Sequence, residues 1–255
     1  MATLGGFAFI RDGVKYDYCF EQSIESLCQC CDQVSIAYIR SGENPDDGTD
    51  ATLLRLEEKF DNLWVHVQGP LMWGSMVGKQ KLSNFQNIAA MCLNMDYQLL
   101  IQADEIIHPN SYSSIREAIE TGAEGFLCER INLWGTPNHM LTVPLERQPC
   151  SVSVVRLTKR GYWCYDDGEN IGVPHPSTAF YDKIKIVHYG FVRKKEVMKA
   201  KIINMQEGVF AMGSHDAKLD QCDIFDSKLW FDGEDLAPIN FTHPPIMNQW
   251  VLDRM

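Results

Sequence analysis

Short apolar runs alternate with amphipathic segments through the first hundred residues, and this rhythm constrains the fold more than any other feature of the chain. Strand and helix patterns that alternate at this spacing are typical of βαβ units, and so of a mostly parallel sheet. We therefore expect an α/β fold with helices on both faces of a central sheet. The expected strands are 4–10, 33–39, 63–67 and 97–101, and the expected helices are 16–29, 50–60 with Asp50 as N-cap, and 81–95.

After residue 104 the rhythm changes, and longer strands with fewer helices predict a mixed sheet in the second half. Nothing near residue 105 resembles a flexible linker, and no internal repeat is present. We therefore predict one domain over residues 1–255, with halves at 1–105 and 106–255. In the second half we expect helices at 109–120 and 192–205, strands at 125–133, 152–157 and 185–189, a loop at 162–177, and an irregular tail over the last fifty residues.

Composition narrows the functional classes. The chain has 23 Lys and Arg against 34 Asp and Glu, a formal charge of −11, which disfavours nucleic acid and anionic membranes as partners. No apolar stretch reaches the roughly 18 residues of a membrane helix, so we expect no transmembrane segment. Nine scattered cysteines, an odd number, indicate reduced thiols in a cytoplasmic protein rather than a disulfide framework.

Two acids, Asp104 and Glu105, follow the expected strand 97–101 after two intervening residues. Ligands of open α/β sheets bind beyond the carboxyl ends of the strands. A carboxylate at that edge can hold a divalent cation against a diphosphate, because hard cations prefer oxygen ligands. The alternative is a strand that simply ends in a solvated acidic turn.

Two further segments lie at the same expected edge. Asp46 and Asp47 belong to a long acidic turn after the second strand, where carboxylates can accept hydrogen bonds from a base or a ribose. Lys79 and Lys81 stand at a helix start, where the helix dipole favours anions over cations. Two lysines at such a position suggest that a phosphate binds between them. Ordinary solvated turns are the alternative for both segments.

The second half adds His188 at a strand end and Asp167 in an acidic loop. A lone histidine is more often a satisfied core residue than a ligand, and the basic run 193–201 after it is most simply a solvated helix face. Asp167 is a candidate general base, and an exposed acidic loop is its alternative. The segment 28–31 contains three cysteines without a second pair at zinc-site spacing, so we expect thiols there.

Taken in order, these segments resemble the GT-A (Rossmann-like) glycosyltransferases, specifically the inverting family-two group that uses nucleotide-diphosphate sugars. The resemblance spans roughly residues 4–206. No single motif is specific, whereas their order and spacing are. The resemblance rests on the opening FAFIRDG, on DDGT at Asp46–Thr49, on Asn87 followed by Ala89, on QADE at Gln102–Glu105, and on HYGF at His188–Phe191 with Lys and Arg residues after it.

The resemblance implies a role for each matching residue. Asp104 matches the metal-binding aspartate of the family, and His188 its late histidine ligand, which implies Mn²⁺ or Mg²⁺. Gln102 replaces the aspartate that usually touches the ribose. The implied nucleotide-binding residues are Asp46, Asp47, Lys79, Lys81, Asn87 and Gln102, and Asp167 is the nearest match to the catalytic base.

The implied function is metal-dependent, inverting transfer of a sugar from a nucleotide-diphosphate sugar to an acceptor hydroxyl on a glycan, a lipid-linked molecule or a protein. Two alternatives remain open. A nucleotidyltransferase also uses a strand-end acid and a nucleotide, but it should carry a Gly-rich phosphate loop after the first strand, of which Arg11–Gly13 is a poor version. A degenerate transferase-like domain could instead serve as a binding scaffold.

Overall fold

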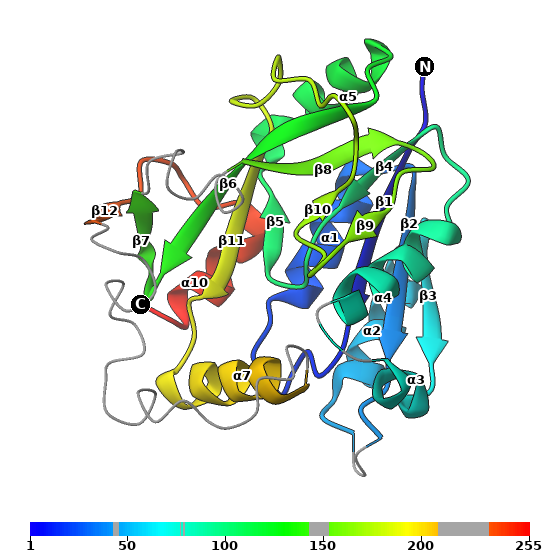
Figure 1. The fold of residues 1–255 in the computed structure, drawn as a ribbon. Helices are drawn as coiled ribbons and strands as arrows, with labels where there is room; N and C mark the ends of the chain where they lie inside the picture. Colours follow the sequence, from blue (N-terminus) through cyan, green and yellow to red (C-terminus); the bar gives the residue numbers. More distant parts are fainter. Residues whose placement is uncertain (43–45, 77, 79, 143–152, 209–234) are drawn as a thin grey trace.

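The computed structural model describes residues 1–255 apart from 43–45, 77, 79, 143–152 and 209–234. One large sheet runs through both halves of the chain in the order β12-β7-β6-β8-β4-β1-β2-β3, with β11 and β5 joined to it through β6 (Figure 1). Its strands are β1 Leu4–Ile10, β2 Gln33–Ile39, β3 Leu63–Gln68, β4 Tyr97–Leu100, β5 Glu105–Ile107, β6 Gly125–Trp134, β7 Thr136–Thr142, β8 Ser153–Lys159, β11 Lys185–Phe191 and β12 Asp235–Pro238.

The first half is a parallel α/β unit, as the sequence predicts. Strand β1 lies between β2 and β4, β3 lies outside β2, and all of these pairs are parallel. The crossover helices are α1 Phe20–Cys30, α2 Thr49–Lys59 and α4 Gln80–Met91, and the short α3 Pro70–Ser75 precedes α4. The carboxyl ends of β1 and β4 therefore meet at one edge of the sheet.

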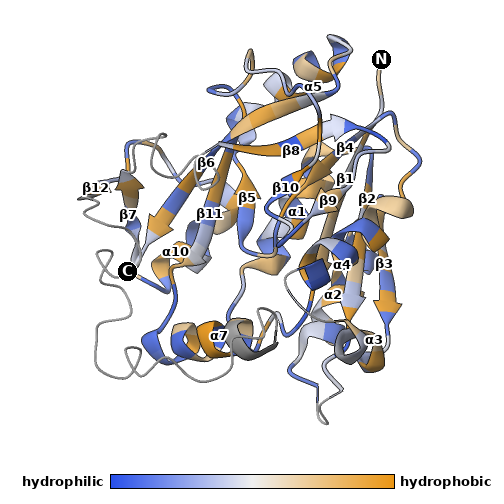
Figure 2. Cartoon of the chain, viewed as in Figure 1, coloured by the Kyte–Doolittle hydropathy of each residue, from blue (hydrophilic) through white to orange (hydrophobic). Residues whose placement is uncertain are grey.

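Successive side chains of the central strands point to opposite faces of the sheet, and both faces are buried. Ala8 and Ile10 of β1 pack in one cluster with α1, α2 and α5 (Tyr112–Glu120). Phe7 faces the other way and packs with Phe85 of α4. Helices thus cover both faces, and Figure 2 shows hydrophobic residues along the central strands between them.

The second half is mixed, and it brings β11 beside β5. Strands β8, β6, β7 and β12 extend the sheet in antiparallel pairs, whereas β11 runs parallel to β6 and antiparallel to β5. In this register His188 of β11 lies opposite Glu105 of β5. This pairing places His188 next to Asp104 and Glu105, the acids that follow β4.

Several local predictions need correction. Helix α2 begins at Thr49 after Gly48, whose φ of 100° is left-handed, and not at an Asp50 N-cap. The expected loop 162–177 contains the hairpin β9 Cys164–Tyr165 and β10 Asn170–Ile171. The described part of the tail contains regular structure, since β12 pairs with β7 and α10 (Asn248–Leu252) packs Trp250 against Tyr189.

In the described ranges, no helix combines the length and the apolar character needed to span a bilayer.

Candidate functional site

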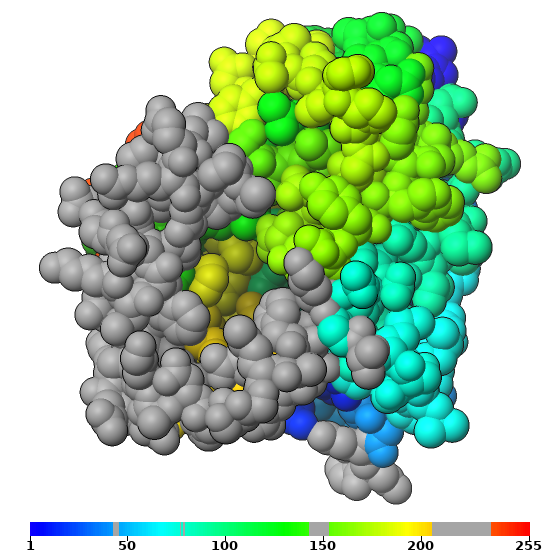
Figure 3. Space-filling model, viewed as in Figure 1, coloured from blue at the N-terminus to red at the C-terminus, as the bar shows by residue number. Residues whose placement is uncertain are grey.

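A cavity of about 520 Å³ lies beyond the carboxyl ends of β1 and β4. Figure 3 shows a hollow in this face, with atoms of the β11–α7 region (α7 is Lys195–Gly208) visible at its floor. The volume lies within the range of small-molecule sites, about 300–1,000 Å³. The lining residues are Phe9, Arg11, Tyr18, Leu82, Gln86, Gln102, Ala103, Asp104, Asp167, Glu169, His188, Phe191, Met198, Lys201, Ile202 and Met205.

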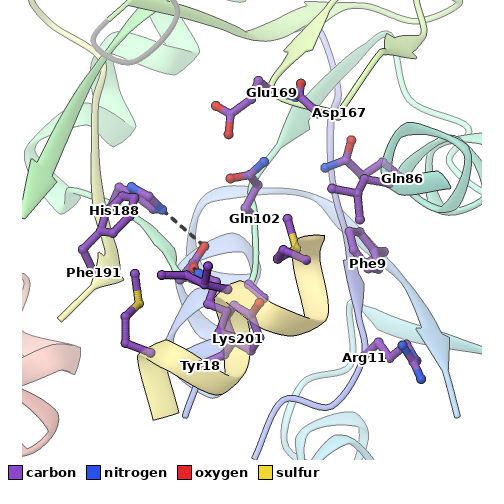
Figure 4. Close-up of a pocket in the computed structure, with 16 residues that line it drawn as sticks. Phe9, Arg11, Tyr18, Gln86, Gln102, Asp167, Glu169, His188, Phe191 and Lys201 are labelled. Atoms are coloured by element: carbon purple, nitrogen blue, oxygen red, sulfur yellow. Dashed lines mark hydrogen bonds and ion pairs between the residues drawn. The ribbon is translucent and has the colours of Figure 1, made fainter. Parts of the chain in front are cut away.

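Asp104 is fixed in the cavity wall by the turn between β4 and β5. The Glu105 carboxylate accepts a hydrogen bond from the backbone N–H of Gln102, and the Tyr189 N–H donates to the Asp104 carbonyl. Asp104 is therefore only 4% exposed, yet its carboxylate lines the cavity. Its Oδ1 lies 3.6 Å from Nε2 of His188, as the dashed line in Figure 4 indicates. The family resemblance implied that these two residues lie together, and in the structure they do.

The other carboxylate oxygen of Asp104 faces two cations. Lys201 Nζ lies 2.9 Å from Oδ2, and Nη2 of Arg193 lies 3.3 Å from it. Burial alone would raise the pKa of Asp104, but the charges of Lys201 and Arg193 and the contact with His188 hold it well below its usual range. Burial lowers the pKa of Lys201 to about 8, helped by Arg193 and opposed by Asp104.

The pair Asp104 and His188 fits a divalent cation in the kind of atoms it presents. His188 Nδ1 hydrogen-bonds to Asn132 Oδ1 at 2.9 Å, so with the proton on Nδ1 the Nε2 lone pair points toward Asp104. Histidine ligands of metals are usually held through their second nitrogen in this way. Among the described residues, no group of three His, Cys, Asp or Glu side chains is arranged to hold a metal. The metal role of the pair stays a prediction.

Asp167 and Glu169 lie on the opposite side of the cavity from Lys201, on the loop that joins β9 to β10 (Figure 4). Glu169 forms an ion pair with Arg130 and lies 3.9 Å from Arg156. Burial acts to raise the pKa of Glu169, but Arg130 and Arg156 outweigh it and lower the pKa. A carboxylate held in this way is a weak proton acceptor. The ion pairs of these two arginines in the described residues involve Glu169 and not Asp167, and the role of Asp167 as a base stays a prediction.

Two glutamines line the cavity between these walls. Gln102 lies between His188 and Asp167 in Figure 4. Gln86 of α4 is 1% exposed, and within the described part of the chain its Oε1 has no hydrogen-bond partner. A buried amide without a partner is costly unless a ligand or water satisfies it. The Gln86 amide can therefore accept a hydrogen bond from a ligand or a water, and Gln102 also lines the cavity.

The structure gives Asp46 and Asp47 partners in the backbone, away from the cavity lining. Asp46 Oδ1 accepts from the N–H groups of Gly48 and Asp50, which caps α2. Asp47 Oδ2 accepts from Lys15 N at 2.8 Å, and Oδ1 from Thr49 N at 3.0 Å. Burial raises the pKa of Asp47, but these hydrogen bonds lower it further than burial raises it. Their binding of a nucleotide stays a prediction, and both carboxylates already organise the α2 turn.

The two remaining predicted residues on α4 also lie outside the cavity lining. Lys81 places its ammonium 4.5 Å from the ring centre of Trp73, which also carries the Arg11 guanidinium at 4.2 Å. Asn87 hydrogen-bonds to both the N–H and the carbonyl of Cys164 in β9. Asn87 thus joins α4 to the hairpin that carries Asp167. Lys79 lies outside the described residues.

Sequence reasoning missed Lys201 and Arg193 as parts of this site. Both were assigned to a solvated basic face, yet Arg193 is 5% exposed and Lys201 lines the cavity. The available signal was amphipathic spacing, because Met198, Lys201, Ile202 and Met205 share one side of α7. A lysine on the apolar side of a helix needs a buried anionic partner, and here Asp104 supplies it.

Comparison with known proteins gives matches of fold only. No family model matches the chain, and no curated protein matches it. A fragment of S. aureus TarS covering residues 1–349 matches with a TM-score of 0.46 and 10% identity, over 86% of this chain and 68% of that one. The same fragment in complex with UDP-GlcNAc gives 0.47 and 10%, over 86% and 70%. For the longer TarS chain the match covers 42% of that chain. At this identity and TM-score, the matches assign no activity to this chain.

Proposed function

We propose that the chain is a glycosyltransferase, which moves a sugar from a nucleotide-diphosphate sugar to an acceptor hydroxyl with inversion at the anomeric carbon. The observation that carries the proposal is the polarity of the cavity. One wall presents the cation Lys201 beside Asp104, with Arg193 buried behind that carboxylate, and the opposite wall presents Asp167 (Figure 4). Such a site suits a reaction with an anionic leaving group on one side and a proton acceptor on the other.

Each wall has a part in the proposed displacement. The acceptor oxygen forms a bond to the anomeric carbon, while the bond from that carbon to the diphosphate oxygen breaks and its electron pair leaves with the diphosphate. Asp167 takes the proton of the acceptor hydroxyl, which is general-base catalysis. Fixed positive charge near the leaving diphosphate stabilises the charge that develops there. Because the acid and the cations lie on opposite sides, attack and departure take place on opposite faces of the sugar.

The proposal keeps Asp104 and His188 as the residues that would hold Mn²⁺ or Mg²⁺. Such an ion would supply Lewis-acid stabilisation of the leaving diphosphate, and substrate phosphates commonly complete its coordination. Gln102 and Gln86 would orient the ribose and sugar hydroxyls. The acceptor is a glycan, a lipid-linked molecule or a protein.

The test is an assay that reports which product is released. We expect the protein to release nucleoside diphosphate from at least one member of a panel of UDP-, GDP-, ADP- and CDP-linked sugars, with added Mn²⁺ and simple sugar acceptors. A nucleotidyltransferase would instead release pyrophosphate from a nucleoside triphosphate and a sugar phosphate. Binding of nucleotide sugars without any turnover would favour the scaffold alternative. Either result would overturn the proposal.

A further inference from the structure

Lys201 reaches the cavity from α7, a helix of the second half of the chain. It lies on α7, ninety-seven positions after Asp104, and its ammonium donates to Asp104 Oδ2 at 2.9 Å and to the Gly190 carbonyl at 3.4 Å. The ammonium also lies 4.9 Å from the ring centre of Tyr18. Figure 4 shows Lys201 and Tyr18 together on the side of the cavity away from Asp167.

Arg193 contacts the same Asp104 carboxylate from the side that faces the protein interior. Its side chain has no exposed surface and does not line the cavity. Its Nη1 donates to the Tyr16 carbonyl, its Nη2 faces Asp104, and its guanidinium carbon lies 4.7 Å from the ring centre of Tyr18. These three contacts hold the Arg193 guanidinium in the protein interior, where it does not reach the cavity.

Counting charges around Asp104 leaves an excess on the cavity side. One carboxylate faces two cations, Lys201 at 2.9 Å and Arg193 at 3.3 Å, so the three groups together carry one net positive charge. Among the ion pairs of the described residues, no second carboxylate balances this charge, and of the two cations only Lys201 lines the cavity. A buried charge without a full counter-charge is costly. An anion entering the cavity would remove this cost and would meet the ammonium first.

Resting on the function proposed above, we propose that Lys201 is a substrate-contacting residue whose ammonium binds the diphosphate of the nucleotide sugar. The contact needs no metal, so part of the affinity for a nucleoside diphosphate persists without one. Lysine serves as a point-charge ligand of phosphate groups in many proteins. The proposal also assigns α7 a role in donor binding.

The experiment is calorimetric titration of the intact protein with whichever of UDP, GDP, ADP and CDP binds tightest, once in EDTA and once in Mn²⁺. We expect Lys201→Gln to weaken binding about tenfold to a hundredfold in both buffers, the usual range for a hydrogen bond to a charged group. Lys201→Arg should recover most of the loss. The control, Lys194→Gln, removes an exposed lysine just before the same helix and should change affinity less than about twofold.

The matching nucleoside separates a diphosphate contact from general damage. Lys201→Gln should bind the nucleoside as the wild type does. The inference is overturned if Lys201→Gln binds the diphosphate normally, if it loses nucleoside and diphosphate equally, or if the wild type binds only in Mn²⁺. In the last case the proposed glycosyltransferase still stands. If no nucleoside diphosphate binds in either buffer, the proposed function itself fails.

Discussion

Nη2 of Arg156 lies 2.6 Å from Oε1 of Glu105, and neither side chain has any exposed surface. The same guanidinium donates through Nη1 to the Gly168 carbonyl at 3.3 Å. Glu105 directly follows Asp104, and Gly168 directly follows Asp167. One buried arginine therefore connects the loop that carries Asp167 to the turn that carries Asp104.

Replacing Arg156 should be strongly destabilising. Arg156→Met leaves Glu105 with one of its two arginines, Arg130, at 3.3 Å, and an incompletely paired buried charge costs about 3–5 kcal/mol. The measurement is urea denaturation followed by circular dichroism. Lys159→Met, at the end of the same strand, removes an exposed pair with Glu124 and should leave the midpoint nearly unchanged. Equal midpoints for the two variants would show that the buried connection contributes nothing.

We expect position 190 to tolerate no side chain, because Gly190 packs directly against His188 and Asp104, the proposed metal-binding pair. A Cβ at this position would lie 2.2 Å from His188 Nε2 and 3.0 Å from Asp104 Oδ2. Gly190→Ala must therefore move the histidine, and a displacement of about 1 Å can lower turnover roughly a hundredfold. Gly74→Ala is the control, since nothing lies within 4 Å of its added Cβ. Turnover at the wild-type rate in Gly190→Ala would contradict this geometry.

Replacing Asn87 distinguishes two roles: the nucleotide binding that the family resemblance implies, and the structural link to Cys164 that its hydrogen bonds indicate. Its side chain makes two hydrogen bonds to Cys164, so Asn87→Ala should lower the free energy of unfolding by about 1–3 kcal/mol. Asn84→Ala, on an exposed part of the same helix, should not. Wild-type stability together with lost nucleoside diphosphate binding would instead assign Asn87 to the donor.

Much of the fold is predictable from local patterns. The first half alternates two periodicities, and the predicted strands 4–10 and 33–39 match β1 and β2 to the residue. The short strand β5 was not predictable, because Glu105–Ile107 is only three residues long and exists by pairing with β11, about eighty positions later. The same non-local pairing brings His188 to Asp104, a meeting that only the family resemblance indicated.

The charged residues were harder to place than the apolar ones. Arg156, Arg130 and Glu105 form a buried network, and no local pattern marks an arginine as buried. Asp46 and Asp47 stand where a nucleotide-binding acid is expected, yet each already accepts backbone hydrogen bonds in the α2 turn. Sequence patterns indicate that a polar residue is near a strand end, whereas its partner depends on the tertiary fold.

Stability should fall in acid through Glu169. Its folded-state pKa is lowered by Arg130 and Arg156, so the unfolded chain binds a proton first as the pH falls. The stabilisation is complete above the unfolded glutamate pKa of about 4.3 and is lost as the pH falls through the lower folded value. Glu169→Gln should therefore be less stable than wild type at pH 7, with the difference shrinking below about pH 4.3. Denaturation curves at pH 7, 5 and 3.5 measure this, and a constant difference would exclude it.

The most direct test of the central claim is the effect of Asp167→Asn on turnover and on donor binding, measured in the same preparation. The substitution removes the proposed base but leaves the cations around Asp104 in place, so nucleoside diphosphate should bind with wild-type affinity. Its release from the nucleotide sugar in the presence of acceptor should fall about 10²–10⁴-fold. Asp182→Asn makes the same chemical change at an exposed acid and should transfer sugar at the wild-type rate. Wild-type turnover in Asp167→Asn would contradict the account, because Asp167 would then not be the base that accepts the proton of the acceptor hydroxyl.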